Sequence, residues 1–140
     1  MFQTFESKDV CEPVAVVEKR LVRRMVSNRC TFCELVEGNL PVREVYVDEH
    51  IFVFHNQLNW APVMLLIIPK VHMTQEEVWN NEKLMGRIGL KAVELGNEYC
   101  PNGFRLLANF GSDALQSQCH GHVHMIGGTK LGLYVGLDHP

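Results

Sequence analysis

The stretch "QCHGHVHMIGG", residues 118–128, sets three of the chain's seven histidines, His120, His122 and His124, at every second position. Side chains of an extended strand alternate between two faces, so these three rings are expected to share one face. Val123, between the second and third histidine, is then expected to face a core. Three polar rings on one sheet face are unfavourable unless each finds a partner, so the pattern indicates a functional site.

Two chemistries suit such a row: metal binding, and acid–base or nucleophilic work near neutral pH, where imidazole readily changes protonation. The preceding loop, "GSDALQSQ", brings backbone N–H groups together with Ser112, Gln116, Ser117 and Gln118. Such a collection of donors can hold an anion such as phosphate. A histidine nitrogen beside a bound phosphate can attack phosphorus and form a covalent intermediate. Chemistry at phosphorus is therefore the favoured hypothesis.

The size and composition of the chain fit one ordinary globular domain. It has 140 residues, of which 46% are hydrophobic and 21% charged. The longest apolar run, "APVMLLII" at 61–68, is too short to cross a bilayer, and no membrane partner is expected. A net charge of -3 argues against general nucleic-acid binding. The first ten residues lack a basic start followed by an apolar core, so a cytoplasmic location is predicted.

The first half of the chain shows four periodic segments. Residues 12–28 place apolar residues at steps of three and four, which predicts an N-terminal amphipathic helix. The segment "CTFCELVEGNLP", 30–41, predicts a short helix that ends near its glycine. "REVYVDEHIFVFHN", 43–56, predicts a hairpin with its turn near Asp48 and Glu49, and "VMLLIIP", 63–69, predicts a third strand. The chain thus begins with an added helix and continues with a helix and three strands.

The second half predicts one long helix and two more strands. Thr74, followed by a glutamine and two glutamates, suits an N-cap, and the helix is expected to run to about Tyr99. "GFRLLANF", 103–110, and "CHGHVHMIG", 119–127, are the further strands. The order of elements predicts an α+β domain with a five-stranded antiparallel sheet, one long helix and one short helix.

The segment "NFGSDALQSQCHGHVHMIGG", 109–128, resembles the signature of the histidine-triad (HIT) superfamily of nucleotide hydrolases and transferases. His-x-His-x-His preceded by Gln-Ser is specific, and the resemblance extends upstream to cover about 30–128. It is nearest to the branch of purine nucleoside phosphoramidases. The resemblance implies a HIT-like fold, a homodimer with a sheet continuous across the pair, and two parts: a helical extension over 1–29 and a HIT domain over 30–140.

The resemblance also implies a reaction. The chain would hydrolyse purine nucleoside phosphoramidates or related nucleotide conjugates at the α-phosphorus, with His122 becoming transiently nucleotidylated. His124 would steady the phosphate oxygens, Ser117 and Gln116 would contact the phosphate or the leaving group, and Asn109 would lie beside them. Hydrolysis of diadenosine polyphosphates, nucleotidyl transfer to another acceptor, or a nucleotide-binding regulatory module with little turnover are the alternatives.

Positions matching the family's nucleoside contacts are Ile51, Phe54, His55 and Asn56. The chain departs from the pattern at three places. Asn56 stands where relatives usually have an acid that accepts hydrogen bonds from both ribose hydroxyls, so ribose recognition is expected to be weaker or differently arranged. Leu115 replaces a glycine and is expected to crowd the phosphate loop. Gly121 replaces an apolar residue and is expected to loosen the strand.

Cys30 and Cys33 form a CxxC, whose spacing suits two thiolates on one zinc ion. Zinc needs four ligands, so the pair alone is a weak signal, and two reduced thiols are the alternative. Some bacterial-type HIT proteins complete such a site with the histidine of their PKxH segment and the first histidine of the triad. That resemblance implies a structural zinc held by Cys30, Cys33, His72 and His120, with His122 left for chemistry.

Overall fold

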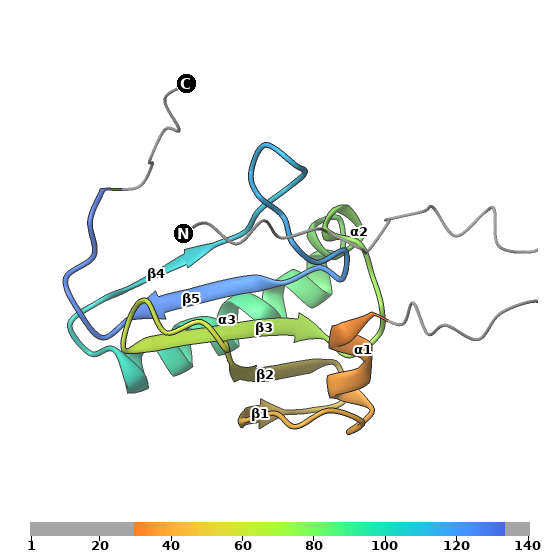
Figure 1. The fold of residues 1–140 in the computed structure, drawn as a ribbon, viewed down its shortest axis with the longest axis horizontal. Coiled ribbons are helices and arrows are strands. Elements are labelled where there is room, and N and C mark those ends of the chain that lie inside the picture. Colours follow the sequence, from red (N-terminus) through yellow and green to blue (C-terminus); the bar gives the residue numbers. More distant parts are fainter. Residues whose placement is uncertain (1–29, 134–140) are drawn as a thin grey trace, which may run out of the picture.

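The computed structural model describes residues 30–133. The predicted helical extension over 1–29 and the last residues of the predicted HIT domain lie outside the described part. Two short helices, one long helix and five strands follow one another along the described chain (Figure 1): α1 (Thr31–Val36), β1 (Glu44–Val47), β2 (Ile51–His55), β3 (Val63–Pro69), α2 (Gln75–Trp79), α3 (Glu82–Tyr99), β4 (Phe104–Leu107) and β5 (Val123–Gly127).

The five strands form a single sheet in the order β1-β2-β3-β5-β4, and every neighbouring pair is antiparallel. Figure 1 shows α3 lying behind the sheet, while α1 sits at one end of strands β1 to β3. This arrangement confirms the predicted α+β fold with a five-stranded antiparallel sheet. β4 and β1 are the two edge strands, and β5, which contains His124, lies between β3 and β4.

The two faces of the sheet bury different clusters because side chains alternate along each strand. On β3, Leu65 and Ile67 pack with the apolar side of α3, whereas Leu66 and Ile68 pack with Phe32 and its neighbours on α1. The α3 face carries the larger core. We call the other surface of the sheet the α1 face, and it is the one that receives the histidines.

The predicted hairpin is held by Asp48, which directly follows β1. Its Oδ1 accepts hydrogen bonds from the backbone N–H groups of His50 and Ile51, at 2.7 Å and 2.8 Å. An aspartate that bonds the backbone two and three residues ahead stabilises a tight turn. The turn therefore falls at the predicted place, and it fixes the alternation of β2 from Ile51 onward.

The predicted long helix is interrupted. Thr74 caps α2 as expected, in a capping box with Glu77, but α2 ends at Trp79 and α3 starts at Glu82. The side chain of Asn81 accepts a hydrogen bond from the N–H of Leu84, at 3.0 Å, and so begins a second helix. Asparagine competes for backbone donors in this way, which makes it a better helix start than helix interior.

The last strand is shorter than predicted. β5 begins at Val123, so His120 and His122 precede the strand instead of lying in it. Residues 123, 125 and 127 are buried, and His124 between them is partly exposed, which is the alternation expected of a strand with one packed face. The backbone of residues 120–122 therefore needs partners other than the sheet.

Candidate functional site

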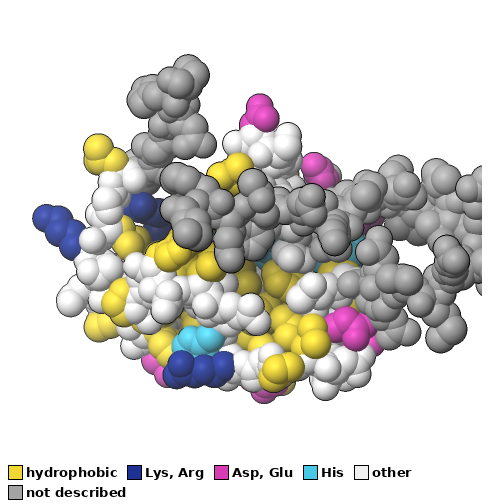
Figure 2. Space-filling model, viewed as in Figure 1, with side chains coloured by type: hydrophobic (Ala, Val, Ile, Leu, Met, Phe, Trp, Pro, Cys, Tyr) yellow, Lys and Arg dark blue, Asp and Glu magenta, His cyan; other side chains and the backbone are white. Residues whose placement is uncertain are grey.

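The described histidines at the start of β5 form a row with His72. The ring centroids of His122 and His124 are 4.9 Å apart, and those of His72 and His120 are 5.0 Å apart. His120 and His122 expose 0% and 2% of their surface, so they need polar partners inside the protein. Figure 2 shows histidine side chains beside hydrophobic ones on this side of the molecule.

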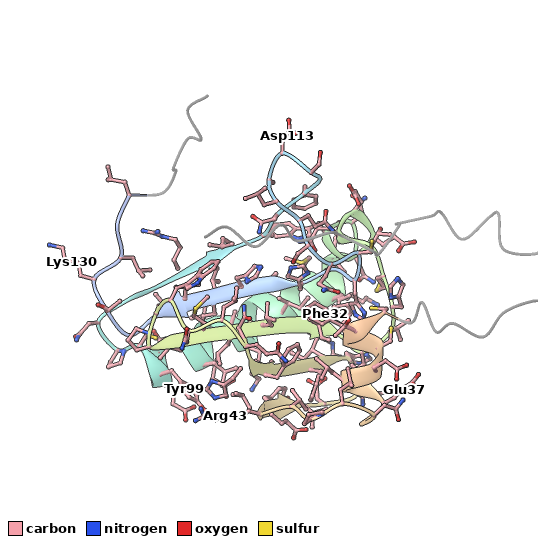
Figure 3. All side chains as sticks on the ribbon, viewed as in Figure 1. Phe32, Glu37, Arg43, Tyr99, Asp113 and Lys130 are labelled. Carbon is pink, nitrogen blue, oxygen red and sulfur yellow. The ribbon has the colours of Figure 1, made fainter. Side chains whose placement is uncertain are left out.

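Phe32 on α1 covers the middle of the row. Its ring meets His122 edge to face at a centroid distance of 5.4 Å, and His120 at 5.8 Å. It also packs against Phe54 of β2 at 5.6 Å. Figure 3 places Phe32 where α1 meets the sheet. Phe32 carries no chemical signal of its own in the sequence, although its position between the two cysteines of "CTFC" ties it to the candidate metal ligands.

The orientation of His122 is set by its own neighbour. Its Nδ1 lies 2.8 Å from the backbone oxygen of His120. A carbonyl oxygen can only accept a hydrogen bond, so Nδ1 carries the proton and Nε2 of the neutral ring keeps its lone pair. Burial lowers the pKa of His122, which favours that neutral ring. The lone pair at Nε2 is what attack on phosphorus requires.

His120 has the opposite orientation. Its Nε2 donates to the backbone oxygen of Pro69 at 2.7 Å, so the unprotonated nitrogen is Nδ1. That Nδ1 lies 3.5 Å from Sγ of Cys30 and 3.6 Å from Sγ of Cys33. Burial lowers the pKa of His120 to about 4, so the ring is neutral at physiological pH. A histidine that donates one N–H to a carbonyl and turns the other nitrogen inward matches a metal ligand.

Four ligand atoms converge at this point. Those of Cys30, Cys33, His72 and His120 all lie within 4.8 Å of one another. Nδ1 of His72 is 3.4 Å from Sγ of Cys33. A tetrahedral zinc ion with ordinary Zn–S and Zn–N bonds separates sulfur from nitrogen by about 3.6 Å. The donor set and its spacing therefore fit zinc, and the cluster could hold a metal ion.

The position of Cys33 in this cluster changes the pKa of its thiol. Burial, followed by the charge of Cys30, raises the pKa of Cys33 to about 12. Without a cation, the Cys33 thiol would therefore keep its proton. A divalent cation reverses that preference, because it stabilises thiolates directly. The cluster is thus suited to a metal more than to a reactive free thiolate.

His124 ends the row on the far side from the cysteines. Burial, and then the neighbouring His122, lower its pKa to about 4. The residue is paired in the sheet with Leu66 of β3 and Leu107 of β4, so its backbone is fixed. A neutral ring held at this place can donate one hydrogen bond toward a ligand beside His122.

The predicted phosphate loop joins β4 to β5. Figure 3 shows it projecting beyond the sheet, with Asp113 at its tip. Both amide atoms of Gln116 are used to close the loop, since Oε1 accepts from Gly111 N at 2.8 Å and Nε2 donates to Gln118 O at 2.9 Å. Ser117 is exposed. The side chain of Ser117 is therefore accessible to solvent, while Gln116 shapes the turn.

Leu115 has a φ of 57°, in the left-handed region that favours glycine. Its side chain is 77% exposed and turns to solvent, so the expected crowding of the loop does not occur. The effect of leucine in place of glycine is instead strain in the backbone of residue 115, which costs about 1 kcal/mol in the left-handed region.

The four predicted nucleoside contacts divide between the two faces of β2. Phe54 packs in the α1-face cluster, and Asn56 follows two residues later in the same alternation. Ile51 is 1% exposed and belongs to the core against α3. The ring of His55 lies 6.4 Å from that of Tyr99, at the end of α3. The sheet therefore separates the side chains of Ile51 and His55 from the histidine row.

The family model of the HIT domain matches residues 37–131. The chain is 34% identical over 104 residues to an uncharacterized HIT-like protein of Chlamydia trachomatis, covering 72% of this chain and 94% of the relative. It is 31% identical over 103 residues to protein HitA of Neisseria gonorrhoeae, covering 71% of this chain and 96% of HitA. The chain belongs to the HIT family.

Solved structures agree with that assignment. A HIT family hydrolase from Legionella pneumophila superposes with a TM-score of 0.68 at 31% identity, covering 74% of this chain and 96% of the hydrolase. A histidine triad protein from Clostridium difficile gives a TM-score of 0.68 at 30% identity, covering 81% and 100%. The likeness to a HIT family hydrolase supports a hydrolase-type enzyme. No helix among residues 30–133 is long and apolar enough to span a membrane.

Proposed function

We propose that the protein is a hydrolase that acts at the α-phosphorus of purine nucleoside phosphoramidates or related nucleotide conjugates, through a nucleotidyl-histidine on His122. The observation that carries this proposal is the 2.8 Å contact between His122 Nδ1 and His120 O. It leaves Nε2 unprotonated on a ring fixed between Phe32 and His124. A fixed lone pair is the main requirement of a nucleophile that must meet phosphorus in line.

The proposed reaction has two displacements. Nε2 of His122 forms a bond to phosphorus as the bond to the leaving amine breaks, and the amine takes up a proton from solvent. Water then attacks the same phosphorus, its oxygen forms the new bond, and the bond to Nε2 breaks to release the nucleoside monophosphate. The proton lost by water passes to solvent. His124, Ser117 and Asn109 are the groups we propose beside the phosphate oxygens and the leaving group.

Asn56 is the residue we propose for the ribose. Its Oδ1 already accepts a hydrogen bond from the backbone N–H of Leu58, at 3.0 Å. The amide nitrogen is then the group left to meet a hydroxyl, and it can only donate. Relatives with an acid offer acceptors at this position, so we expect this chain to bind ribose less tightly than they do.

We propose that the cluster of Cys30, Cys33, His72 and His120 holds a structural zinc ion. Both cysteines come from the start of α1, and the histidines come from the segments after β3 and before β5. The ion would therefore join α1 to the sheet and keep Phe32 against His122. When bound, zinc supplies charge stabilisation for two thiolates and ties loops together, and it has no part in the attack on phosphorus.

We propose a homodimer formed through the β4 edge. An apolar groove of about 260 Å³ lies between α3 and β4, lined among others by Trp79, Ile88 and Leu106. Trp79 and Phe110 pack against each other at 5.7 Å yet remain about half exposed. An edge strand beside an apolar surface is a site for pairing with another chain. A second copy joined at β4 would extend the sheet across the pair.

The hydrolase proposal is tested with the tryptamine phosphoramidate of adenosine 5′-monophosphate. Release of tryptamine, with a nucleotide adduct on His122 found by mass spectrometry after acid-free quenching, is the expected result. Faster cleavage of a diadenosine polyphosphate by the same protein would assign that substrate class instead. Tight AMP binding with no release from any conjugate would contradict a hydrolase and favour a regulatory module.

A further inference from the structure

Gln75, the first residue of α2, has no exposed surface. Its side-chain amide bonds both polar groups of the His122 backbone: Oε1 accepts from His122 N at 2.8 Å, and Nε2 donates to His122 O at 3.0 Å. One donor and one acceptor directed at a single residue reproduce what a neighbouring strand offers in an antiparallel ladder. The amide thus supplies the pairing that the backbone of His122 lacks.

The amide occupies a defined place in the sheet. The register of β4 and β5 pairs Phe104 with Gly127 and Leu107 with His124, so each step along one strand goes one step back along the other. Continued by two residues, the ladder would set Asn109 opposite His122. Nε2 of Gln75 also donates to Asn109 O, at 3.2 Å. Gln75 therefore holds the two backbones apart where they would otherwise pair.

Gly121 makes this arrangement possible. A β-carbon at this position would lie 2.5 Å from Cγ2 of Val78 and 3.1 Å from Oε1 of Gln75. The N–H of Gly121 donates to Met73 O at 2.7 Å, so the turn before α2 packs directly on the backbone beside His122. The glycine that departs from the family pattern therefore tightens this segment, and the expected loosening of the strand is not what the geometry gives.

A buried glutamine must be hydrogen-bonded for stability alone. The targets of Gln75 go beyond that need, because they are the backbone of the proposed nucleophile and the backbone of Asn109, beside which the phosphate loop begins. The Nδ1 contact of His122 to His120 O depends on the same short backbone segment. A shift of this segment would turn Nε2 away from phosphorus without removing any group that touches substrate.

We propose that Gln75 is a positioning residue for the reaction. Its amide fixes the backbone of His122 and the gap between His122 and Asn109, and so aims Nε2 at the phosphate. This inference rests on the proposed hydrolase function. It predicts that Gln75 governs the chemical step and has little influence on how tightly the nucleotide binds.

The variants Gln75→Met and Gln75→Glu test the role. Methionine nearly matches glutamine in shape and removes both hydrogen bonds, whereas glutamate keeps an acceptor and sets a second oxygen against the two carbonyls. We expect kcat for the tryptamine phosphoramidate to fall about 10- to 100-fold, as small misplacements of a reacting group do, with KM changed less than about threefold. Steady-state kinetics of both variants measure this split.

Leu95→Val is the control, because Leu95 is a buried residue of α3 in the core between that helix and the sheet. It should lower thermal stability and leave kcat unchanged. A Gln75 variant whose kcat equals that of Leu95→Val would overturn the inference. If Gln75→Met does not fold, Gln75→Glu alone carries the test.

Hydrogen exchange of the His122 backbone amide, followed by NMR, separates this inference from the hydrolase proposal. The amide should be protected in the wild type and exchange at least about tenfold faster in Gln75→Met, since its acceptor is gone. Unchanged exchange sinks the positioning role. The wild type could instead fail to release tryptamine while the difference in exchange is present. That result would reject the hydrolase proposal and would still show that the Gln75 amide holds the backbone of His122.

Discussion

His120 and His122 are two residues apart, equally buried, and held in opposite orientations. A backbone carbonyl bonds Nε2 of His120 and turns its Nδ1 to the two cysteines. A different carbonyl bonds Nδ1 of His122 and leaves its Nε2 unprotonated. The difference teaches that a carbonyl acceptor, placed by the fold, decides which nitrogen of a neutral histidine is available. One ring becomes a candidate metal ligand and the next a candidate nucleophile.

The largest effects are expected when the same substitution, histidine to glutamine, is made separately at His122 and at His120. We expect His122→Gln to lower turnover of the phosphoramidate by about 10³-fold or more while zinc content stays at the wild-type level, because the nucleophile is lost. His120→Gln should lose zinc. Turnover assays and metal analysis of both proteins measure this. Equal turnover in His122→Gln and wild type would show that the roles have been assigned wrongly.

Substituting a proposed zinc ligand tests the role assigned to His120 and its neighbours. Cys30→Ser should lose zinc and lower the melting temperature by about 10 °C or more, because the bond between α1 and the sheet is lost. Metal analysis and thermal unfolding give the answer. Cys100→Ser is the control, since Cys100 is a buried free cysteine away from the cluster. A metal-free wild type purified under reducing conditions would argue against the zinc site.

Titration of His124 extends the comparison to the third ring. Burial, and then His122, hold its pKa near 4 against 6.5 when exposed, so between these values the unfolded chain binds a proton that the folded chain does not. Stability from this group is present above pH 6.5 and is lost as the pH falls toward 4. His124→Gln should therefore lose fewer degrees of melting temperature than wild type between pH 7 and pH 5. Identical pH profiles would contradict the burial of a neutral ring.

The smallest effect is expected from a substitution of Asn56, which changes AMP affinity and leaves His120 and His122 in place. Asn56→Asp should tighten AMP binding about fivefold, because a charged acceptor bonds hydroxyls more strongly than an amide does. Calorimetry on the metal-loaded protein measures the affinity. Asn59→Asp adds the same charge at an exposed place in the same loop. If both variants bind AMP alike, Asn56 does not meet the ribose.

The sequence predicted most of the fold because its signals are local. Thr74 predicted the start of a helix, Asp48 predicted a turn, and the apolar run at 63–69 predicted a buried strand. Each of these is present in the structure. The break before Asn81 was missed because the apolar period continues across it, and a side-chain cap outweighs the pattern there. Strand β5 was predicted to begin too early, because the alternation of histidines continues beyond the ladder that supports it.

The site was predictable as a set of residue types and not as a geometry. The convergence of Cys30, Cys33, His72 and His120 followed from a resemblance, and their ligand atoms do meet. Which nitrogen each ring presents depends on carbonyls distant in sequence, such as that of Pro69. In the sequence Gln75 is only the glutamine after the Thr74 cap, and its burial against the backbone of His122 required the structure.

The residues predicted to contact the nucleoside divide between the two faces of the sheet. Phe54 and Ile51 lie on the same strand three residues apart, so alternation sends their side chains to opposite faces. Ile51 lies in the core on the α3 face. β2 is buried on both faces and therefore has apolar residues on each. Motif matching therefore located the strand, while the face of each residue required the structure.

Nitrogen NMR of ¹⁵N-histidine-labelled protein tests the central claim most directly, because protonated and unprotonated ring nitrogens differ widely in chemical shift. We expect at pH 7 a proton on Nδ1 of His122 and on Nε2 of His120, with the signal of Nδ1 of His120 shifted when zinc is added. A proton on Nε2 of His122, or the same tautomer at both rings, would contradict the opposite orientations of the two rings.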